Sequence, residues 1–390
     1  MQVSRSATST LDEVRMEGDP DWEVIGLEKL LRYLCDMAAE FKTLLLSVLR
    51  RHNRLRLILY ADGITPGSGF AHDNKRKSTI WYISFLEFGR LLCYEECWFT
   101  LASARTSFCK AAPAGISGLT RRLLRDLFVV QRVSDNGVTV HGVTAYVDFH
   151  ALLGDEEALN AMLYTKGASG TVPCAALCCV VNKPIASDRE LGLPSLAERS
   201  PLIVDISCSD IRRIGRKTDA DVWKLCDDVA ALGGGERKKK EKSSGFGYHA
   251  EALLYDHVLR VYFKPASQTR VDPMHIVFSN GVMSSEVMLL LGCIKERHGH
   301  YFKELREHLE PWKAPRHAQH SALSDLVNEH RERSSNDMLK VGGASASAAV
   351  STAAFSLIDL CISSGVDRLP LHMAHISKKD VLVRLAPQSS

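Results

Sequence analysis

The sequence predicts an α/β protein in which a mixed β-sheet is flanked by helices. Between residues 22 and 164, runs rich in aromatic and β-branched residues alternate with amphipathic segments, a pattern typical of sheets covered by helices. Hydrophobic residues make up 45% of the 390-residue chain, enough for a buried core and about two or three domains. Two aspartates, Asp62 and Asp155, each follow an apolar run and stand where a strand is expected to end.

The first fifty residues are expected to contain a disordered start and a helical segment. Residues 1–20 are polar, which favours disorder. From Trp22 to Arg51, apolar residues recur at spacings of three and four. This periodicity predicts one or two amphipathic helices in a segment spanning residues 21–53.

Three strands and a helix are predicted next. Leu55–Tyr60, Ser78–Phe88 and Trp98–Ala104 are rich in the aromatic, aliphatic and β-branched residues that favour strands. Ser117–Val130 places its leucines on one face and its arginines elsewhere. It therefore predicts a helix, with Ser117 as the capping residue.

A fourth strand and a further helix complete this region. Val138–Leu153 predicts the strand, with a hairpin turn at Asp135–Gly137. Glu156–Tyr164 predicts a helix directly after Asp155, and Ala175–Val181 predicts a short further strand.

The predicted order is strand, strand, strand, helix, strand, helix, which is the element order of an RNase H-like domain. In such a domain the first and fourth strands lie side by side, so Asp62 and Asp155 would meet at one edge of the sheet. We therefore predict an RNase H-like core over residues 54–182.

The remaining chain is expected to surround and extend this core. A mostly helical insertion is predicted over residues 183–335, and a helical tail over 336–390. Within the insertion, the Gly- and Lys-rich run 233–245 predicts an exposed, flexible basic loop.

A pair of carboxylates at strand ends suits metal-dependent phosphoryl transfer. Two divalent ions, roughly 3.5–4 Å apart, neutralise charge on the attacking and leaving oxygens. Carboxylates supply the hard oxygen ligands that Mg²⁺ or Mn²⁺ prefers. The alternative is purely local: Asp62 would begin a turn before Gly63, and Asp155 would cap the following helix.

Three motifs occur in an order that resembles a known family. Asp62–Gly67 resembles the Asp-Gly-x-x-Pro segment around the first catalytic acid of CACTA-type (EnSpm/Plavaka-like) DDE transposases. The stretch from Asp155 through Lys166-Gly167 to the cysteines at 174–179 resembles the region of their second acid. Asp272–His275 resembles their Asp-x-x-His motif. The pattern is similar to transposase-like proteins that are abundant in dinoflagellate genomes.

The resemblance implies a transposase that acts on DNA by two-metal phosphoryl transfer. Asp62 and Asp155 would bind Mg²⁺ or Mn²⁺, and Asp272 and His275 would support the acids or contact DNA. Alternatively, Asp272 caps a turn and His275 packs in the core. A third catalytic acid is also implied, and Glu286, on an apolar helix face, is the candidate unless it points to solvent.

Cysteines that follow the second acid suggest a zinc site. Cys174 and Cys178 are spaced Cys-x₃-Cys, close to the spacing of a tetrahedral Zn²⁺ knuckle. The alternative is that they are small buried hydrophobic residues.

Clusters of cations predict contacts with the DNA backbone. Phosphate binding scales with the number of cations placed along the backbone. The predicted DNA-binding residues are Lys75, Arg76, Lys77, Arg121, Arg122 and Arg125. The alternative is that they form solvated faces.

The composition indicates which cellular compartment and which binding partners to expect. Eleven cysteines, with no charged and apolar leader at the start, favour a reducing compartment, the nucleus or cytoplasm. We expect DNA as partner, with a homo-oligomer as one option, and neither a membrane nor a small-molecule substrate. Because the tail up to Ser390 offers no convincing third acid, we expect a truncated or degenerate transposase. The alternative function is a non-catalytic DNA- or protein-binding remnant with the same fold.

Overall fold

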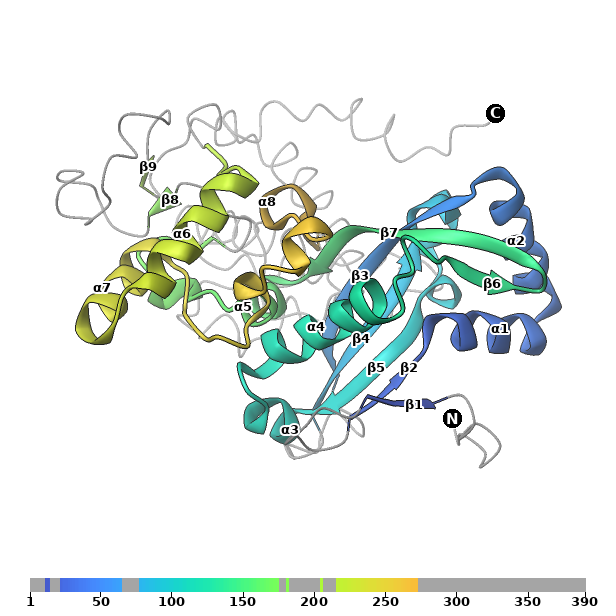
Figure 1. Cartoon of the computed structure of the whole chain (residues 1–390), viewed down its shortest axis with the longest axis horizontal. Helices are drawn as coiled ribbons and strands as arrows, with labels where there is room; N and C mark the ends of the chain where they lie inside the picture. Colours follow the sequence, from blue (N-terminus) through green and yellow to red (C-terminus); the bar gives the residue numbers. More distant parts are fainter. Residues whose placement is uncertain are drawn as a thin grey trace, which may run out of the picture. The chain divides into compact units, whose positions relative to one another are not determined.

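The computed structural model of the chain describes residues 11–14, 22–64, 77–174, 180–181, 204–205 and 215–272. The chain divides into two units, Met1–Asp272 and Pro273–Ser390, and all described residues belong to the first. The described part is a mixed α/β fold in which helices pack on a curled, mixed sheet (Figure 1).

The main sheet combines antiparallel and parallel strands. In chain order these are β1 (Leu11–Val14), β2 (Trp22–Ile25), β3 (Arg54–Ile64), β4 (Ser78–Phe85), β5 (Phe99–Arg105), β6 (Val138–Val140), β7 (Val143–Gly154) and β10 (Thr269–Val271). Their order across the sheet is β1-β2-β5-β4-β3-β7-β10, and β6 pairs with β7. Strands β3, β7 and β10 run parallel to one another, whereas β4 is antiparallel to both of its neighbours, β3 and β5.

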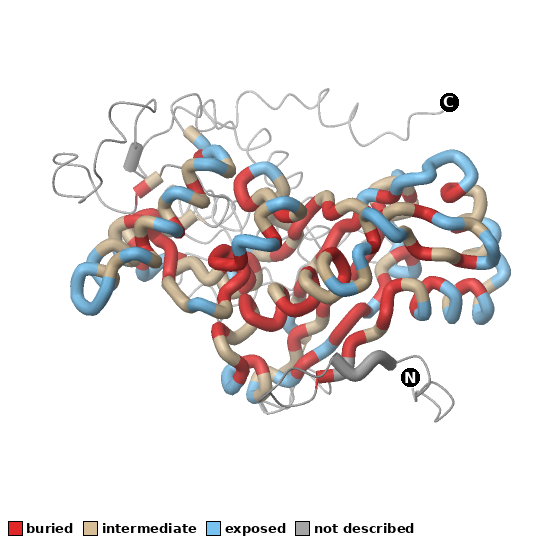
Figure 2. The backbone as a smooth tube through the Cα atoms, in the orientation of Figure 1, coloured by how far each residue is buried: buried red, intermediate tan, exposed pale blue. Residues whose placement is uncertain are grey.

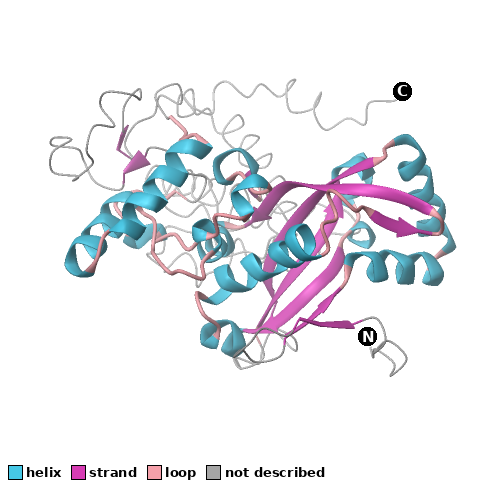
Figure 3. Ribbon diagram, viewed as in Figure 1, coloured by secondary structure: helices cyan, strands magenta, loops and turns pink. Residues whose placement is uncertain are grey.

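Helices cover the sheet and extend from both of its ends (Figure 3). They are α1 (Leu27–Met37), α2 (Ala39–Arg51), α3 (Thr106–Ala111), α4 (Gly115–Arg125), α5 (Glu156–Leu163), α6 (Asp219–Ala231), α7 (Gly234–Ser244) and α8 (Pro265–Gln268). Short 3₁₀ turns connect several of them, and a separate parallel pair joins β8 (Val180–Val181) to β9 (Val204–Asp205). Among the described helices, none is long and apolar enough to cross a bilayer.

The core lies between the central strands and α4. Alternate residues of β3 are buried on one face, namely Leu55, Leu57, Leu59 and Ala61. Trp81 lies opposite Ala61 on β4, and its indole Nε1 donates a hydrogen bond to Thr120 Oγ1 of α4 over 3.0 Å. Buried leucines on α4 complete this layer (Figure 2). Each fully buried leucine contributes about 1.5–3 kcal/mol, so this contact fixes the sheet against its helices.

The predicted order of elements between residues 55 and 164 is confirmed. The structure adds the short strand β6 and helix α3 to that order. The first and fourth predicted strands lie side by side, because β3 pairs in parallel with β7 and places Tyr60 opposite Leu153.

The predicted helix from Trp22 is wrong over its first residues. Trp22–Ile25 form strand β2, and Val24 pairs with Ala102 of β5. The Trp22 indole also donates to the carbonyl of Ser103 over 3.0 Å. Pairing with a neighbouring strand outweighs local helical periodicity here, and the helix begins only after Gly26.

The predicted cap of α4 is also wrong. The helix begins at Gly115, after Ala114 in the left-handed region with φ of 57°. Ser117 lies buried inside the first turn, where its Oγ accepts a hydrogen bond from Leu253 N over 2.9 Å. Its hydroxyl therefore serves a tertiary contact 136 residues away in the chain.

The hairpin turn lies later than predicted. Strands β6 and β7 pair Val140 with Val143, so the connection is His141-Gly142. Both residues have positive φ, 46° and 79°, as the tight turns that match strand twist require. The predicted turn residues, Asp135–Gly137, instead lead into β6.

Two corrections concern the predicted insertion. Residues 234–244 form helix α7, not a flexible loop. Strand β10, at Thr269–Val271, pairs with β7 and belongs to the core sheet, although it lies within the range predicted as insertion. The core thus draws on residues well beyond 182.

Candidate active site

Asp62 and Asp155 lie at the same level on neighbouring parallel strands. Tyr60 of β3 is in register with Leu153 of β7, and each aspartate follows two residues later. Adjacent strands are about 4.8 Å apart, so the two backbones approach closely at this edge. The predicted convergence of the two acids is supported by this register and by the pocket that both residues line.

A third aspartate continues the same row. Val271 of β10 is in register with Gly154 of β7, which places Asp272 level with Asp155. The Asp272 N–H donates to the Gly154 carbonyl over 2.8 Å. An aspartate therefore lies near the carboxyl end of each of three adjacent parallel strands: Asp62 two residues before the end of β3, and Asp155 and Asp272 directly after β7 and β10. This is the edge at which open α/β sheets bind ligands.

The Tyr60 side chain is influenced by the negative charge of all three aspartates in this row. Its ring stacks on Tyr82 at 6.0 Å between centroids and meets Trp98 edge-on at 5.9 Å. Burial, followed by the negative charges of Asp62, Asp272 and Asp155 in that order, raises the pKa of the Tyr60 phenol well above its ordinary value. Tyr60 is thus a neutral phenol, able to donate a hydrogen bond, surrounded by carboxylates.

Both aspartates have the local roles that were considered as alternatives. Asp62 Oδ1 accepts a hydrogen bond from Gly63 N at 2.7 Å. Asp155 Oδ1 accepts from Ala158 N at 2.6 Å and caps α5. Each bond occupies one oxygen, and among the described residues no hydrogen bond or ion pair uses the Oδ2 of either aspartate. A structural role and a ligand-binding role are therefore compatible.

Asp62 and Asp155 both line a pocket of about 350 Å³. Its wall also includes two cations, Lys77 before β4 and Lys110 of α3, and one further acid, Glu157 of α5. Thr79 and Thr106 add hydroxyl groups. The pocket therefore combines carboxylates, ammonium groups and hydroxyls, which suits an anionic ligand bound together with cations.

The row of acids does not form a closed three-ligand cage. Within residues described by the structure, no three His, Cys, Asp or Glu side chains are close enough to hold one metal ion. The arrangement is a pair of carboxylates in one pocket with Asp272 beside it in the sheet. Such a pair leaves room for water and substrate oxygens around a cation.

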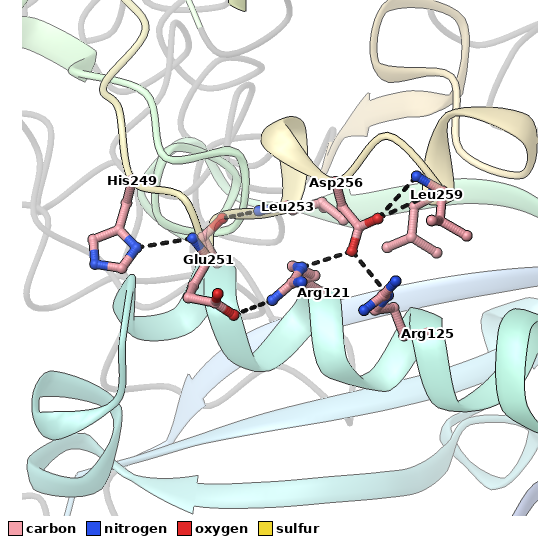
Figure 4. Close-up of polar contacts among 9 residues, drawn as sticks. Arg121, Arg125, His249, Glu251, Leu253, Asp256 and Leu259 are labelled. Carbon is pink, nitrogen blue, oxygen red and sulfur yellow. Dashed lines mark hydrogen bonds and ion pairs between the residues drawn. The ribbon is translucent and has the colours of Figure 1, made fainter. Parts of the chain in front are cut away.

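Two of the three arginines of α4 form ion pairs within the fold (Figure 4). Arg121 bonds to Glu251 and, over 2.6 Å, to Asp256. Arg125 forms an ion pair with Asp256 over 3.0 Å. Arg122 is 7% exposed, and burial lowers its pKa. Arg121 and Arg125 therefore hold the segment around residues 249–259 against α4. The prediction that the three arginines bind DNA stays a prediction.

Asp256 is the structural residue that the sequence analysis missed. Its Oδ1 accepts hydrogen bonds from Val258 N and Leu259 N at 3.0 and 3.3 Å, while its Oδ2 faces the arginines. An acid within the apolar run Leu253–Leu259 is unexpected, and this was the signal that could have identified a buried ion pair.

The remaining predicted residues divide into two groups. Lys77 lies on the pocket, and Cys174 is half-buried after the 3₁₀ turn Gly167–Ser169. The others fall outside the described residues, so the predictions for them stay predictions: Lys75, Arg76, Cys178, His275 and Glu286.

Comparison with known proteins gives no family assignment, because neither any protein-family model nor any curated protein matches the chain.

Proposed function

We propose that this chain is a DDE transposase-like protein that acts on DNA by metal-dependent phosphoryl transfer. The observation that carries the proposal is the pair Asp62 and Asp155. Each follows the last registered pair of the parallel strands β3 and β7, Tyr60 and Leu153, by two residues, and both line one pocket. The three motifs that resemble CACTA-type transposases begin at Asp62, Asp155 and Asp272, and these aspartates lie near the carboxyl ends of β3, β7 and β10.

The strand arrangement supports an RNase H-like core. Three antiparallel strands, β3, β4 and β5, precede α4, and β7 then returns to lie parallel to β3. Strand β10 extends the parallel part beyond β7. This is the arrangement in which the first and fourth strands bring two acids to one edge.

The donor chemistry fits Mg²⁺ or Mn²⁺. These ions favour oxygen ligands and bind through one or two carboxylates together with water and substrate phosphates. Asp62 and Asp155 would hold the ions, which would supply charge neutralisation on the oxygens of the reacting phosphate. The hydrogen bond from Ala158 N fixes the orientation of the Asp155 carboxylate, so part of the site is organised before ligands arrive.

Tyr60 and Asp272 would support this pair. The neutral Tyr60 phenol can donate a hydrogen bond within the acid row, which orients a carboxylate without adding charge. Asp272 continues the row by register and would act as the third acid within the sheet. Glu286 remains the alternative third acid.

A second candidate function is a non-catalytic DNA- or protein-binding remnant with the same fold. The absence of a three-acid cage among the described residues favours it. The two functions differ in whether the chain breaks a phosphodiester bond, which can be measured directly.

The proposal is tested by nicking of supercoiled DNA in the presence of Mg²⁺. We expect cleavage that stops in EDTA and is lost in Asp62→Asn, because an amide oxygen is a weaker ligand than a carboxylate. Asp148→Asn is the matched control, since Asp148 lies on the neighbouring strand β7 but pairs with Arg54 over 2.6 Å, outside the acid row. Cleavage that survives Asp62→Asn would contradict the proposal, and binding without any cleavage would favour the remnant.

A further inference from the structure

Two lysines share the pocket with the acid pair, and their positions are fixed by the fold. Lys77 immediately precedes β4, whose first residue, Ser78, is in register with Ile64 at the end of β3. A β-carbon on Gly63 would lie 3.1 Å from Lys77 Cε and 3.7 Å from its Nζ. The lysine side chain therefore lies over Gly63, the residue that follows Asp62, and a larger residue at position 63 would displace it.

Thr106 links Lys77 to the second lysine. Its N–H and its Oγ1 both donate to the Lys77 carbonyl, each over 2.9 Å. Thr106 is also the first residue of α3, and Lys110 follows four residues later on the same side of that helix. One threonine thus connects the backbone of Lys77 to the helix that carries Lys110.

Helix α3 is anchored in the core by one buried residue, Cys109. Cys109 is 3% exposed and packs in the core, and burial raises the pKa of its thiol. Cys109 is therefore an anchor for the helix, while its neighbour Lys110 is exposed and lines the pocket.

Both ammonium groups are available to a ligand. Within the described ranges, no ion pair engages Lys77 or Lys110, in contrast to Arg121, whose partners are Glu251 and Asp256. Lysine binds phosphate as a point charge. A phosphate near metal-bound carboxylates would meet these two cations in the same pocket.

We infer that Lys77 and Lys110, organised by Thr106, form a seat for a single backbone phosphate of the nucleic-acid substrate beside the acid pair. The seat rests on the proposed function, because it supposes that the pocket receives a phosphodiester. It assigns Lys110 a substrate contact, and it makes Thr106 a positioning residue that acts through Lys77.

The test uses the full chain and a fluorescein-labelled duplex oligonucleotide, with binding followed by anisotropy in EDTA at several salt concentrations. We expect the variant Lys77→Ala/Lys110→Ala to bind about three- to tenfold more weakly at low salt. The plot of log affinity against log salt concentration should become shallower, its slope decreasing in magnitude by about one, as the loss of one phosphate contact predicts. Lys224→Ala, on the exposed surface of α6, is the control and should leave both values unchanged.

A second readout separates this inference from the proposed function. Mn²⁺ binding, measured by electron paramagnetic resonance, should persist in the double lysine variant and be lost in Asp62→Asn. Unchanged DNA affinity and salt slope in the double variant would overturn the seat. Parallel loss of Mn²⁺ binding and DNA binding would also overturn it, because the lysines would then be structural. Failure of the proposed function would appear instead as the absence of Asp62-dependent Mn²⁺ binding in the wild-type chain.

Discussion

The Arg121–Asp256 network and the Asp62–Asp155 pocket contain similar residue types but use their charges differently. In the network, the Asp256 side chain is 3% exposed and faces both Arg121 and Arg125. In the pocket, each of the two aspartates has one oxygen in a local hydrogen bond, and two lysines line the same pocket. The first cluster is neutralised within the fold, whereas the second retains charge that a ligand can use.

This difference shows that the residue type alone does not tell which charged group can bind a ligand. What matters is whether other side chains of the fold already neutralise its charge. A buried charge costs several kcal/mol unless it is paired and hydrogen-bonded, so Asp256 requires its arginines. A charge beside a solvent-filled pocket carries a smaller penalty and can remain unpaired until a cation binds. Removing a charge should therefore affect stability in the network and activity in the pocket.

The largest expected effect on stability comes from Asp256→Asn. The variant leaves Arg121 and Arg125 with reduced counter-charge in a buried site, and we expect the free energy of unfolding to fall by about 3–5 kcal/mol. Asp62→Asn should change it by less than about 1 kcal/mol, because the site is partly exposed and the amide can still accept from Gly63 N. Urea unfolding followed by circular dichroism measures both. Similar losses in the two variants would remove the distinction between network and pocket.

Two substitutions of Asp155 can separate its role as a helix cap from its proposed role as a metal ligand. Asn is as good a helix cap as Asp, whereas Ala removes the cap at a cost of about 1 kcal/mol. We therefore expect Asp155→Asn to keep the stability of the wild type and to lose Mg²⁺-dependent cleavage, and Asp155→Ala to lose both. Thermal unfolding and the nicking assay report the two effects. Full cleavage by Asp155→Asn would show that capping is its only role.

Much of the site could be predicted from sequence because its elements are defined locally. Strands β3 and β7 are long and apolar, so their existence and the placement of Asp62 and Asp155 near their carboxyl ends follow from short-range patterns. Their bounds do not: β3 is predicted as Leu55–Tyr60 but continues to Ile64, because Asp62, Gly63 and Ile64 pair with β4. Strand β10 could not be predicted in the same way. It has only three residues, and it exists because Thr269–Val271 pairs with β7.

Helix α7 shows why other parts escaped prediction. Its glycines and lysines are typical of a loop, and it has no apolar face. It is held instead by Arg237, whose guanidinium lies 4.1 Å from the Tyr248 ring centroid, and by the 2.9 Å ion pair between Glu241 and Lys166. The roles of Asp256 and Lys110 are similarly long-range, because each depends on contacts between segments distant in the chain.

The ion pair between Arg260 and Asp227, whose carboxylate is half exposed, should contribute less to the free energy of unfolding than the buried network. Hydrogen bonds from Arg260 lower the pKa of Asp227 from its ordinary value of 3.8. A carboxyl with a lowered folded-state pKa contributes stability above its unfolded pKa, and that contribution is lost as pH falls through the folded pKa. Because the Asp227 side chain is 48% exposed, we expect less than about 1 kcal/mol. The stability difference between wild type and Asp227→Asn should therefore shrink between pH 6 and pH 3. A difference that stays constant over this range would contradict the assignment.

Calorimetric titration of the full chain with MnCl₂ tests the central claim most directly, namely that Asp62 and Asp155 together hold a divalent cation. We predict that the wild type binds Mn²⁺, that Asp62→Asn and Asp155→Asn each weaken binding at least about tenfold, and that the double variant loses little more. Equal Mn²⁺ binding by the wild type and the double variant would contradict the account.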